Sequence, residues 1–347
     1  MLPERKPDFE RIKTTLAFQE PDRVPNFEIC VARPVREALL NMPLPDGLEA
    51  ELFYRPRLHY DYIFLNPPYR RPPVYSRHAE NRTEARTWVD QHANMVTDWD
   101  SFRKYTEYPE PDAPLDLREI EAGCRAARRA EGFLGVGALL PSCPFTEINL
   151  VMGYENFAIA LYEDYELCKA LAAKFGEVGV ASAKQLAASD VDFVFFGDDM
   201  ANTRGLMISP EFMRDLFFPY YRRFIEIVRD AGKPILFHSD GDISALIPDW
   251  IDAGLNGLNP IEPLAMDIVA LKREYAGKLV LTGNVDVDLL TRGTPEAVSA
   301  LTRERLNQLK PGGGYMLGSS NSVCDYVNPV NFQTMLLTNA EYGVYVK

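Results

Sequence analysis

The chain has 347 residues, of which 46% are hydrophobic and 25% charged, and its formal net charge at pH 7 is -13. This acidic balance argues against nucleic acid or an anionic membrane surface as a partner, because both are polyanions. No apolar run approaches the roughly 20 residues of a membrane span, and the first residues lack the apolar core of a signal peptide. The five cysteines are scattered without paired spacing, so we expect a reducing compartment and a cytoplasmic protein.

The N-terminal part is predicted to contain a helix and the first strand of a sheet, followed by a long irregular segment that includes the second strand. Residues 8–18 have the pattern of an amphipathic helix, and Val24–Cys30 reads as a first strand with Glu28 near its carboxyl end. Glu28 either faces a pocket or pairs with a cation at the surface. The aromatic, proline-rich residues 53–75 predict a long excursion rather than a helix, with a second strand at Asp61–Leu65.

The next segment, residues 74–98, alternates β-type residues and predicts a small inserted β segment. Tyrosines and arginines of this region either line a substrate or fold a large loop back onto the body. His59, His78 and His92, which lie between residues 53 and 98, have no partner at metal-binding spacing, so we interpret them as ordinary polar residues.

In the middle of the chain, helices are predicted at 116–131 and 164–189, with a third strand at 133–137 between them. A fourth strand, 192–196, is followed by Asp198 and Asp199. Neighbouring side chains of a strand point to opposite sides. We therefore expect only one of the two acids to face a pocket, while the other fixes a loop amide or Arg204.

The C-terminal part continues the alternation of strands and helices. The apolar run 234–237 ends in His238-Ser239-Asp240-Gly241, and the strand at 257–259 leads to Glu262. Further strands at 279–282 and 315–317 precede Asn284 and Cys324, and a last helix covers about 329–340. Eight strands, near residues 24, 61, 133, 192, 234, 256, 279 and 314, predict an α/β fold of the (β/α)8 TIM-barrel class. We expect one domain over 1–347, with residues 31–106 forming an extension and insertion over the barrel mouth.

Four polar residues follow the predicted strands at their carboxyl ends, where α/β barrels keep their chemistry. They are His238, Asp240, Glu262 and Cys324, all of metal-ligand type. We expect them to converge on one metal ion. The alternative for Cys324 is a buried thiol near the last strand.

Three stretches carry a family resemblance: GDDMANTRGLMISPEFMRDLFFPYYRRF from Gly197, then ILFHSDGDI, then LVLTGNVDVDLL. They resemble the uroporphyrinogen decarboxylase superfamily, and within it the cobalamin-linked methyltransferases, which hold zinc on a His-x-Cys pair and a distant Cys. The related cobalamin-independent methionine synthases add a Glu. His238 matches the His, Glu262 falls at the Glu position, Cys324 falls at the last Cys, and Asp240 replaces the first Cys.

The resemblance implies a methyltransferase that uses zinc as a Lewis acid and a cobalamin carried by a corrinoid-binding partner protein. Because Asp240 is a harder donor than a thiolate, we expect the metal to polarise an oxygen, as in an O-methyl compound such as a methoxylated aromatic. Asp198, Asp199 and Asn284 are then expected to position this small methylated substrate or to supply a proton. Glu28, Arg204 and Tyr326 are expected to bind the substrate.

Two alternatives remain at this point. One is a cofactor-free decarboxylase like the enzyme that names the superfamily, although the strand after Pro25 reads NFEICVARP and lacks an Arg-rich signature. The other is a binding homologue that has lost its chemistry. The sequence leaves the direction of methyl transfer open and is compatible with a homodimer.

Overall fold

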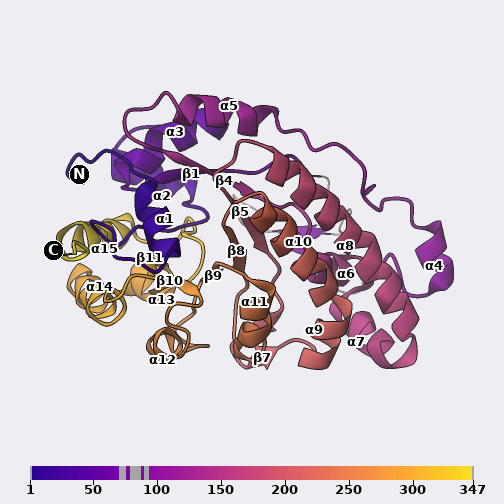
Figure 1. Ribbon diagram of the computed structural model, residues 1–347. Helices are drawn as coiled ribbons and strands as arrows, with labels where there is room; N and C mark the ends of the chain where they lie inside the picture. Colours follow the sequence, from indigo (N-terminus) through magenta and orange to yellow (C-terminus); the bar gives the residue numbers. More distant parts are fainter. Residues whose placement is uncertain (1, 70–75, 79–86, 90–93, 346–347) are drawn as a thin grey trace.

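The protein, seen in a computed structural model that describes residues 2–69, 76–78, 87–89 and 94–345, is built around a curled parallel sheet. Seven strands lie in the order β1-β4-β5-β8-β9-β10-β11 (Figure 1). Each overlaps a strand predicted from the sequence, because each is a short buried apolar run. The α/β TIM-barrel class is thereby confirmed. The strands are β1 (Tyr62–Leu65), β4 (Gly135–Leu139), β5 (Phe193–Gly197), β8 (Ile235–His238), β9 (Gly257–Asn259), β10 (Val280–Val285) and β11 (Tyr315–Ser319).

Helices surround the outer face of this sheet (Figure 1). Side chains cap the starts of two of these helices: the Ser209 hydroxyl accepts from the N–H of Phe212, and the Thr294 hydroxyl accepts from the N–H of Ala297. The helices are α1 (Glu10–Leu16), α2 (Arg33–Leu40), α3 (Gly47–Arg57), α4 (Trp99–Lys104), α5 (Arg118–Ala127), α6 (Pro144–Met152), α7 (Tyr154–Glu163), α8 (Tyr165–Ala188), α9 (Pro210–Leu216), α10 (Phe218–Asp230), the 3-10 turn η1 (Ser244–Leu246), α11 (Ile247–Ala253), α12 (Ile268–Glu274), α13 (Val287–Arg292), α14 (Pro295–Leu309) and α15 (Pro329–Tyr342).

Residues 24–31 take the place of the eighth barrel strand, but they form only isolated backbone bridges. Asn26 pairs with Leu317 of β11 and Val31 pairs with Val323, both in parallel. The prediction of a regular strand at Val24–Cys30 is therefore wrong. Pro25, which lacks a backbone N–H, cannot donate to a ladder.

Side chains close the barrel between this segment and β1. The hydroxyl of Tyr62 donates to the carbonyl of Glu28 at 2.7 Å and accepts from its N–H at 2.9 Å. The guanidinium of Arg55, which is buried, donates to the carbonyls of Glu28 and Ile29 at 2.7 and 2.8 Å. These bonds replace the missing ladder, since buried backbone groups need partners.

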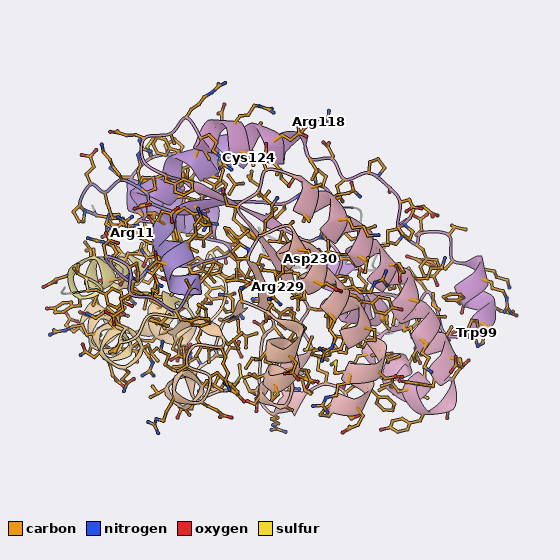
Figure 2. All side chains as sticks on the ribbon, in the orientation of Figure 1. Arg11, Trp99, Arg118, Cys124, Arg229 and Asp230 are labelled. Atoms are coloured by element: carbon orange, nitrogen blue, oxygen red, sulfur yellow. The ribbon has the colours of Figure 1, made fainter. Side chains whose placement is uncertain are left out.

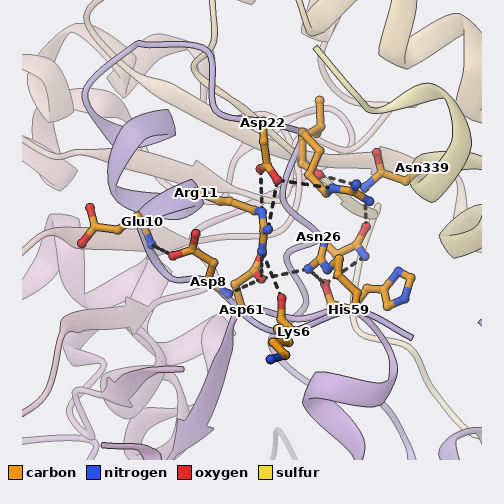
Figure 3. A network of polar contacts seen from close by, with 12 residues as sticks. Lys6, Asp8, Glu10, Arg11, Asp22, Asn26, His59, Asp61 and Asn339 are labelled. Atoms are coloured by element: carbon orange, nitrogen blue, oxygen red, sulfur yellow. Dashed lines mark hydrogen bonds and ion pairs between the residues drawn. The ribbon is translucent and has the colours of Figure 1, made fainter. Parts of the chain in front are cut away.

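A polar network ties the N-terminal segment to the amino end of β1 (Figure 3). One carboxylate oxygen of Asp61 accepts from the guanidinium groups of Arg5 and Arg11 at 2.9 and 2.8 Å, and from the N–H of Asp8 at 2.9 Å. Arg11 also pairs with Asp22 at 2.6 Å. The network lies at the opposite end of the sheet from the polar residues that follow the strands.

The segment predicted as an excursion over the barrel mouth departs in part from that expectation. Residues 53–57 belong to helix α3, which tolerates Pro56 in its last turn, so the prediction of a non-helical segment is wrong there. The small inserted β segment is confirmed: β2 (Ser76–His78) pairs antiparallel with β3 (Thr87–Val89). Residues 74–75, 79–86 and 90–93 of this segment, with His92 among them, lie outside the described residues. Helix α4, with Trp99, lies at the edge of the molecule (Figure 2).

Aromatic side chains fill the barrel interior and show which strand positions face inward. Phe193 and Phe195 of β5 approach Phe27 with ring centroids 6.4 and 6.0 Å apart. Phe196, the residue after Phe195, contacts Phe224 of α10 instead. Odd-numbered residues of β5 therefore face the interior and even-numbered ones face the helices. In the part of the chain that the structure describes, no helix is both long enough and apolar enough to span a bilayer.

Candidate active site at the barrel mouth

The carboxyl ends of β5 and β8 bring two predicted site residues together. Gly197 of β5 pairs with His238, the last residue of β8. His238 lies on the inward side, where its ring is 6.2 Å from that of Phe195. Continuing the alternation of β5, Asp199 falls on this inward side and Asp198 on the other.

Three side chains form a compact cluster at this point. The Nε2 atom of His238 lies 3.5 Å from an oxygen of Asp199 and 3.5 Å from an oxygen of Asp240. One ligand atom from each of the three residues lies within 4.8 Å of the other two. The His238 side chain is largely buried at 15% exposure, whereas those of Asp199 and Asp240 are 58% and 37% exposed. The cluster is thus open to solvent on its acidic side.

The His238 ring is oriented by a residue of the neighbouring strand. Its Nδ1 atom lies 3.0 Å from the side-chain oxygen of Asn259, and the amide nitrogen of Asn259 donates to the Thr282 hydroxyl at 2.6 Å. Because the amide oxygen only accepts, the proton of the ring sits on Nδ1. The Nε2 atom then points at the two acids, as in a metal-ligating histidine held by a second partner.

Glu262 borders the cluster and shares a partner with Asp240. One of its oxygens accepts from the N–H of Gly241 at 3.0 Å. The side-chain amide of Asn321 donates to Asp240 at 2.9 Å and also bonds Glu262. Burial first, and then mutual repulsion between the carboxylates, raises the pKa of Asp240 and of Glu262. A divalent cation would offset this repulsion.

Gly241 fixes the loop between these acids. Its φ of +79° lies in the left-handed region, and an added Cβ would come within 2.6 Å of the backbone of Asn202. Only glycine fits such a position without strain. The loop after His238 is therefore packed tightly against the β6 (Ala201–Asn202) and β7 (Gly205–Leu206) hairpin.

Asp198 faces away from the cluster and holds the start of helix α6. Its buried carboxylate accepts from the N–H groups of Phe145 and Thr146 at 2.9 and 2.8 Å, from the Thr146 hydroxyl at 2.7 Å and from the Tyr221 hydroxyl at 2.7 Å. Burial raises the pKa of Asp198 to about 6 against the lowering effect of these bonds. The two acids therefore diverge as expected: Asp199 joins the cluster, and Asp198 binds backbone amides, which belong to the first turn of α6 rather than to a loop.

The other predicted substrate-binding and catalytic residues are dispersed. Glu28 is buried, so its surface alternative is wrong. Asn284, at the end of β10, donates to the Ile261 carbonyl at 2.8 Å and accepts from Arg305 of α14 at 2.6 Å. Arg204 lies at the tip of the β6–β7 hairpin, where its N–H donates to Asn202 at 2.8 Å. Tyr326 is exposed.

Cys324 is not part of the compact cluster. The preceding residue, Val323, donates its N–H to the Cys30 carbonyl at 3.2 Å and accepts from the N–H of Ala32 at 2.7 Å. This pairing carries Cys324 toward Cys30; burial first, and to a small extent the nearby Cys324, raises the pKa of the Cys30 thiol. The residue that reaches Asp240 from the end of β11 is Asn321. The donor set of the cluster is therefore one imidazole nitrogen and two carboxylate oxygens, which suits zinc and other divalent cations.

Two positioning residues were not identified from the sequence. Asn259 ends β9 and Asn321 follows β11, so both occupy the same kind of place as the predicted ligands. A polar residue directly after a buried strand was the available signal. Among the amides at such positions, the sequence singled out Asn284, which lies elsewhere in the structure and bonds Ile261 and Arg305.

One solved structure agrees with this architecture. A methyltransferase from Methanosarcina mazei shares the fold, with a TM-score of 0.69 at 14% identity over 96% of this chain and 98% of its own. A putative vitamin-B12-independent methionine synthase from Listeria monocytogenes aligns with a TM-score of 0.47 at 12% identity, over 93% of this chain and 97% of its own. No curated protein matches the sequence significantly. Residues 94–342, more than two thirds of the chain, match the family described as uroporphyrinogen decarboxylase (URO-D). The chain therefore belongs to the uroporphyrinogen decarboxylase family.

Proposed function

We propose that this protein is a methyltransferase that takes a methyl group from a small O-methyl compound, such as a methoxylated aromatic, and passes it to a cobalamin on a corrinoid-binding partner protein. The observation that carries the proposal is the cluster of Asp199, His238 and Asp240 at the carboxyl ends of β5 and β8. Family membership and the fold shared with a methyltransferase support it.

Asp199, His238 and Asp240 would hold a divalent cation, with zinc as our choice. Such a cation, when bound, supplies a Lewis acid that stabilises negative charge on an oxygen. The chain's own residues prepare the site: Asn259 fixes the imidazole with its Nε2 atom toward the acids, and Asn321 holds Asp240. Glu262, half-buried beside Asp240, is placed to exchange a proton with a departing alkoxide or phenolate.

The donor set favours an oxygen substrate over a thiol. Thiolate ligands suit soft partners, whereas imidazole and carboxylate donors leave a cation harder. A harder cation prefers an ether or phenolate oxygen.

A decarboxylase of polycarboxylate substrates is supported less well. Asp199, Asp240 and Glu262 lie around His238, and burial already raises the pKa of two of them. A substrate carrying several carboxylates would be repelled by this acidic mouth.

The test is an assay of the purified protein with a panel of methoxylated aromatics and a reduced corrinoid protein, after zinc reconstitution. We expect methylation of the corrinoid by at least one O-methyl donor and loss of activity in His238→Ala. A Cys324→Ala variant is the matched control and should keep its activity. Inactivity toward every O-methyl donor combined with activity on a methylated thiol would contradict the proposal.

A further inference from the structure

A buried glutamate lies behind the cluster, at the closure of the barrel. Glu28 is 3% exposed. One of its carboxyl oxygens accepts from the N–H of Ser319 at 2.6 Å, and the other lies 2.8 Å from the Ser319 hydroxyl. The Ser319 hydroxyl also contacts the backbone carbonyl of Asn321. The Ser319 hydroxyl thus contacts two oxygen atoms, one of Glu28 and one of Asn321, and these two contacts indicate where the protons of Ser319 and Glu28 lie.

A hydroxyl carries one proton, and a backbone carbonyl can only accept. The contact between Ser319 and the Asn321 carbonyl therefore uses the proton of Ser319. The second contact, between Ser319 and Glu28, then needs a proton from the carboxyl group. This arrangement is satisfied when Glu28 is a neutral carboxylic acid whose hydroxyl donates to Ser319 and whose carbonyl oxygen accepts from the Ser319 N–H.

The surroundings of Glu28 agree with this assignment. Burial raises its pKa to about 8, although the contacts with Ser319 and the charge of Arg55 act in the opposite direction. The Arg55 guanidinium is turned to the Glu28 backbone carbonyl and forms its ion pair with Glu51 at 2.9 Å. The other ionisable groups that face Glu28 are the phenols of Tyr60, Tyr62 and Tyr315, none of which carries a positive charge.

The same contacts connect Glu28 to the cluster. The side-chain oxygen of Asn321 accepts from the N–H of Ser322 at 2.6 Å, which turns the amide nitrogen toward the acids. That nitrogen donates to Asp240 at 2.9 Å and bonds Glu262. Glu28 is thus linked to Asp240 through two residues. The Ser319 hydroxyl contacts both Glu28 and the backbone carbonyl of Asn321, and the side-chain amide of the same Asn321 donates to Asp240.

We propose that Glu28 is a positioning residue that acts as a neutral acid: it donates to Ser319, which holds the Asn321 backbone, and Asn321 in turn holds Asp240 and Glu262 at the barrel mouth. The positioning of a metal ligand rests on the proposed function, whereas the protonation of Glu28 does not. In this proposal Glu28 acts on the site through Ser319 and Asn321 and is not itself a metal ligand.

The protonation is tested by infrared difference spectroscopy of the wild-type protein against Glu28→Gln. Glutamine keeps the shape of the neutral acid and has an N–H that can donate to Ser319. At pH 7 we expect the wild type to show a C=O stretching band of a protonated carboxyl group that the variant lacks, and this band should fade as the pH rises past about 8. Absence of such a band at pH 7 would overturn the assignment.

The positioning role is tested by Zn²⁺ titration and by amide hydrogen exchange. Glu28→Gln should bind Zn²⁺ within about twofold of the wild type, whereas Glu28→Ala and Ser319→Ala should bind it about 10-fold or more weakly. Exchange of the Ser322 N–H should accelerate in the two alanine variants and not in the glutamine variant. Unchanged exchange in the alanine variants would overturn the positioning role. Failure of the wild type to bind Zn²⁺, with accelerated exchange in the alanine variants, would contradict the proposed function and leave the Glu28 chain supported.

Discussion

Replacing Tyr221 with phenylalanine removes a single hydroxyl from the buried support of the cluster. That hydroxyl donates to the Asp198 carboxylate at 2.7 Å, and both side chains are buried. Asp198 joins the end of β5, next to Asp199, to the start of α6. The substitution therefore tests whether Asp198 anchors the strand end that presents Asp199.

The expected decrease in the free energy of unfolding follows from the kind of hydrogen bond that is lost. A hydrogen bond to a charged group contributes about 1.5–3 kcal/mol, and phenylalanine fills nearly the same volume, so no large cavity adds to it. Three donors, from Phe145 and Thr146, continue to satisfy the carboxylate. We expect the free energy of unfolding at pH 7.5 to fall by about 2 kcal/mol, measured by urea denaturation followed by circular dichroism.

Tyr165→Phe is the matched control. Its hydroxyl donates to the Asp215 carboxylate at 2.6 Å, but this bond lies at the surface. Exposed polar contacts contribute little, so the control should lose no more than about 0.5 kcal/mol. Equal losses in the two variants would refute the reasoning that burial makes the Asp198 support strong.

Three further predictions concern the barrel mouth. Because the unfolded chain releases the Glu28 proton near pH 4.5 and the folded chain keeps it to about pH 8, stability should fall across that window by on the order of 4–5 kcal/mol from this group. Urea titrations at several pH values should show that Glu28→Gln abolishes this component, and an identical pH slope in the variant would contradict it. Asn259→Ala should weaken Zn²⁺ binding about 10- to 100-fold in calorimetry, because His238 loses the acceptor of its Nδ1 proton; unchanged affinity would show that Asn259 does not orient the ring. Cys324→Ala should keep its Zn²⁺ affinity within about twofold of the wild type, since the thiol lies outside the cluster; a tenfold loss of affinity would show that Cys324 is a ligand.

The barrel strands could be predicted because local sequence determines them. Runs such as Ile235–His238 and Phe193–Gly197 are apolar, short and buried, and a parallel sheet covered by helices requires such runs. The same alternation predicted that Asp198 and Asp199 diverge. The prediction of a first strand failed because it followed the apolar pattern of Val24–Cys30, whereas Pro25 has no N–H to donate to a ladder.

The composition of the cluster could be predicted only in part. His238 and Asp240 are two residues apart at one strand end, so their proximity follows from the local sequence. Whether Cys324 or Asn321 lies beside Asp240 depends on how the chain turns after Ser319, the last residue of β11. Backbone hydrogen bonds to residues 30 and 32 fix this turn. Such long-range pairing has no local signature. The protonation of Glu28 likewise depends on burial by distant residues.

The most direct test of the central claim is the location of the metal in crystals of the zinc-reconstituted protein, by anomalous scattering at the zinc edge. The account predicts one strong anomalous peak bonded to His238 Nε2 and to carboxylate oxygens of Asp199 and Asp240. A peak bonded to Cys324, or none within reach of His238, would contradict it.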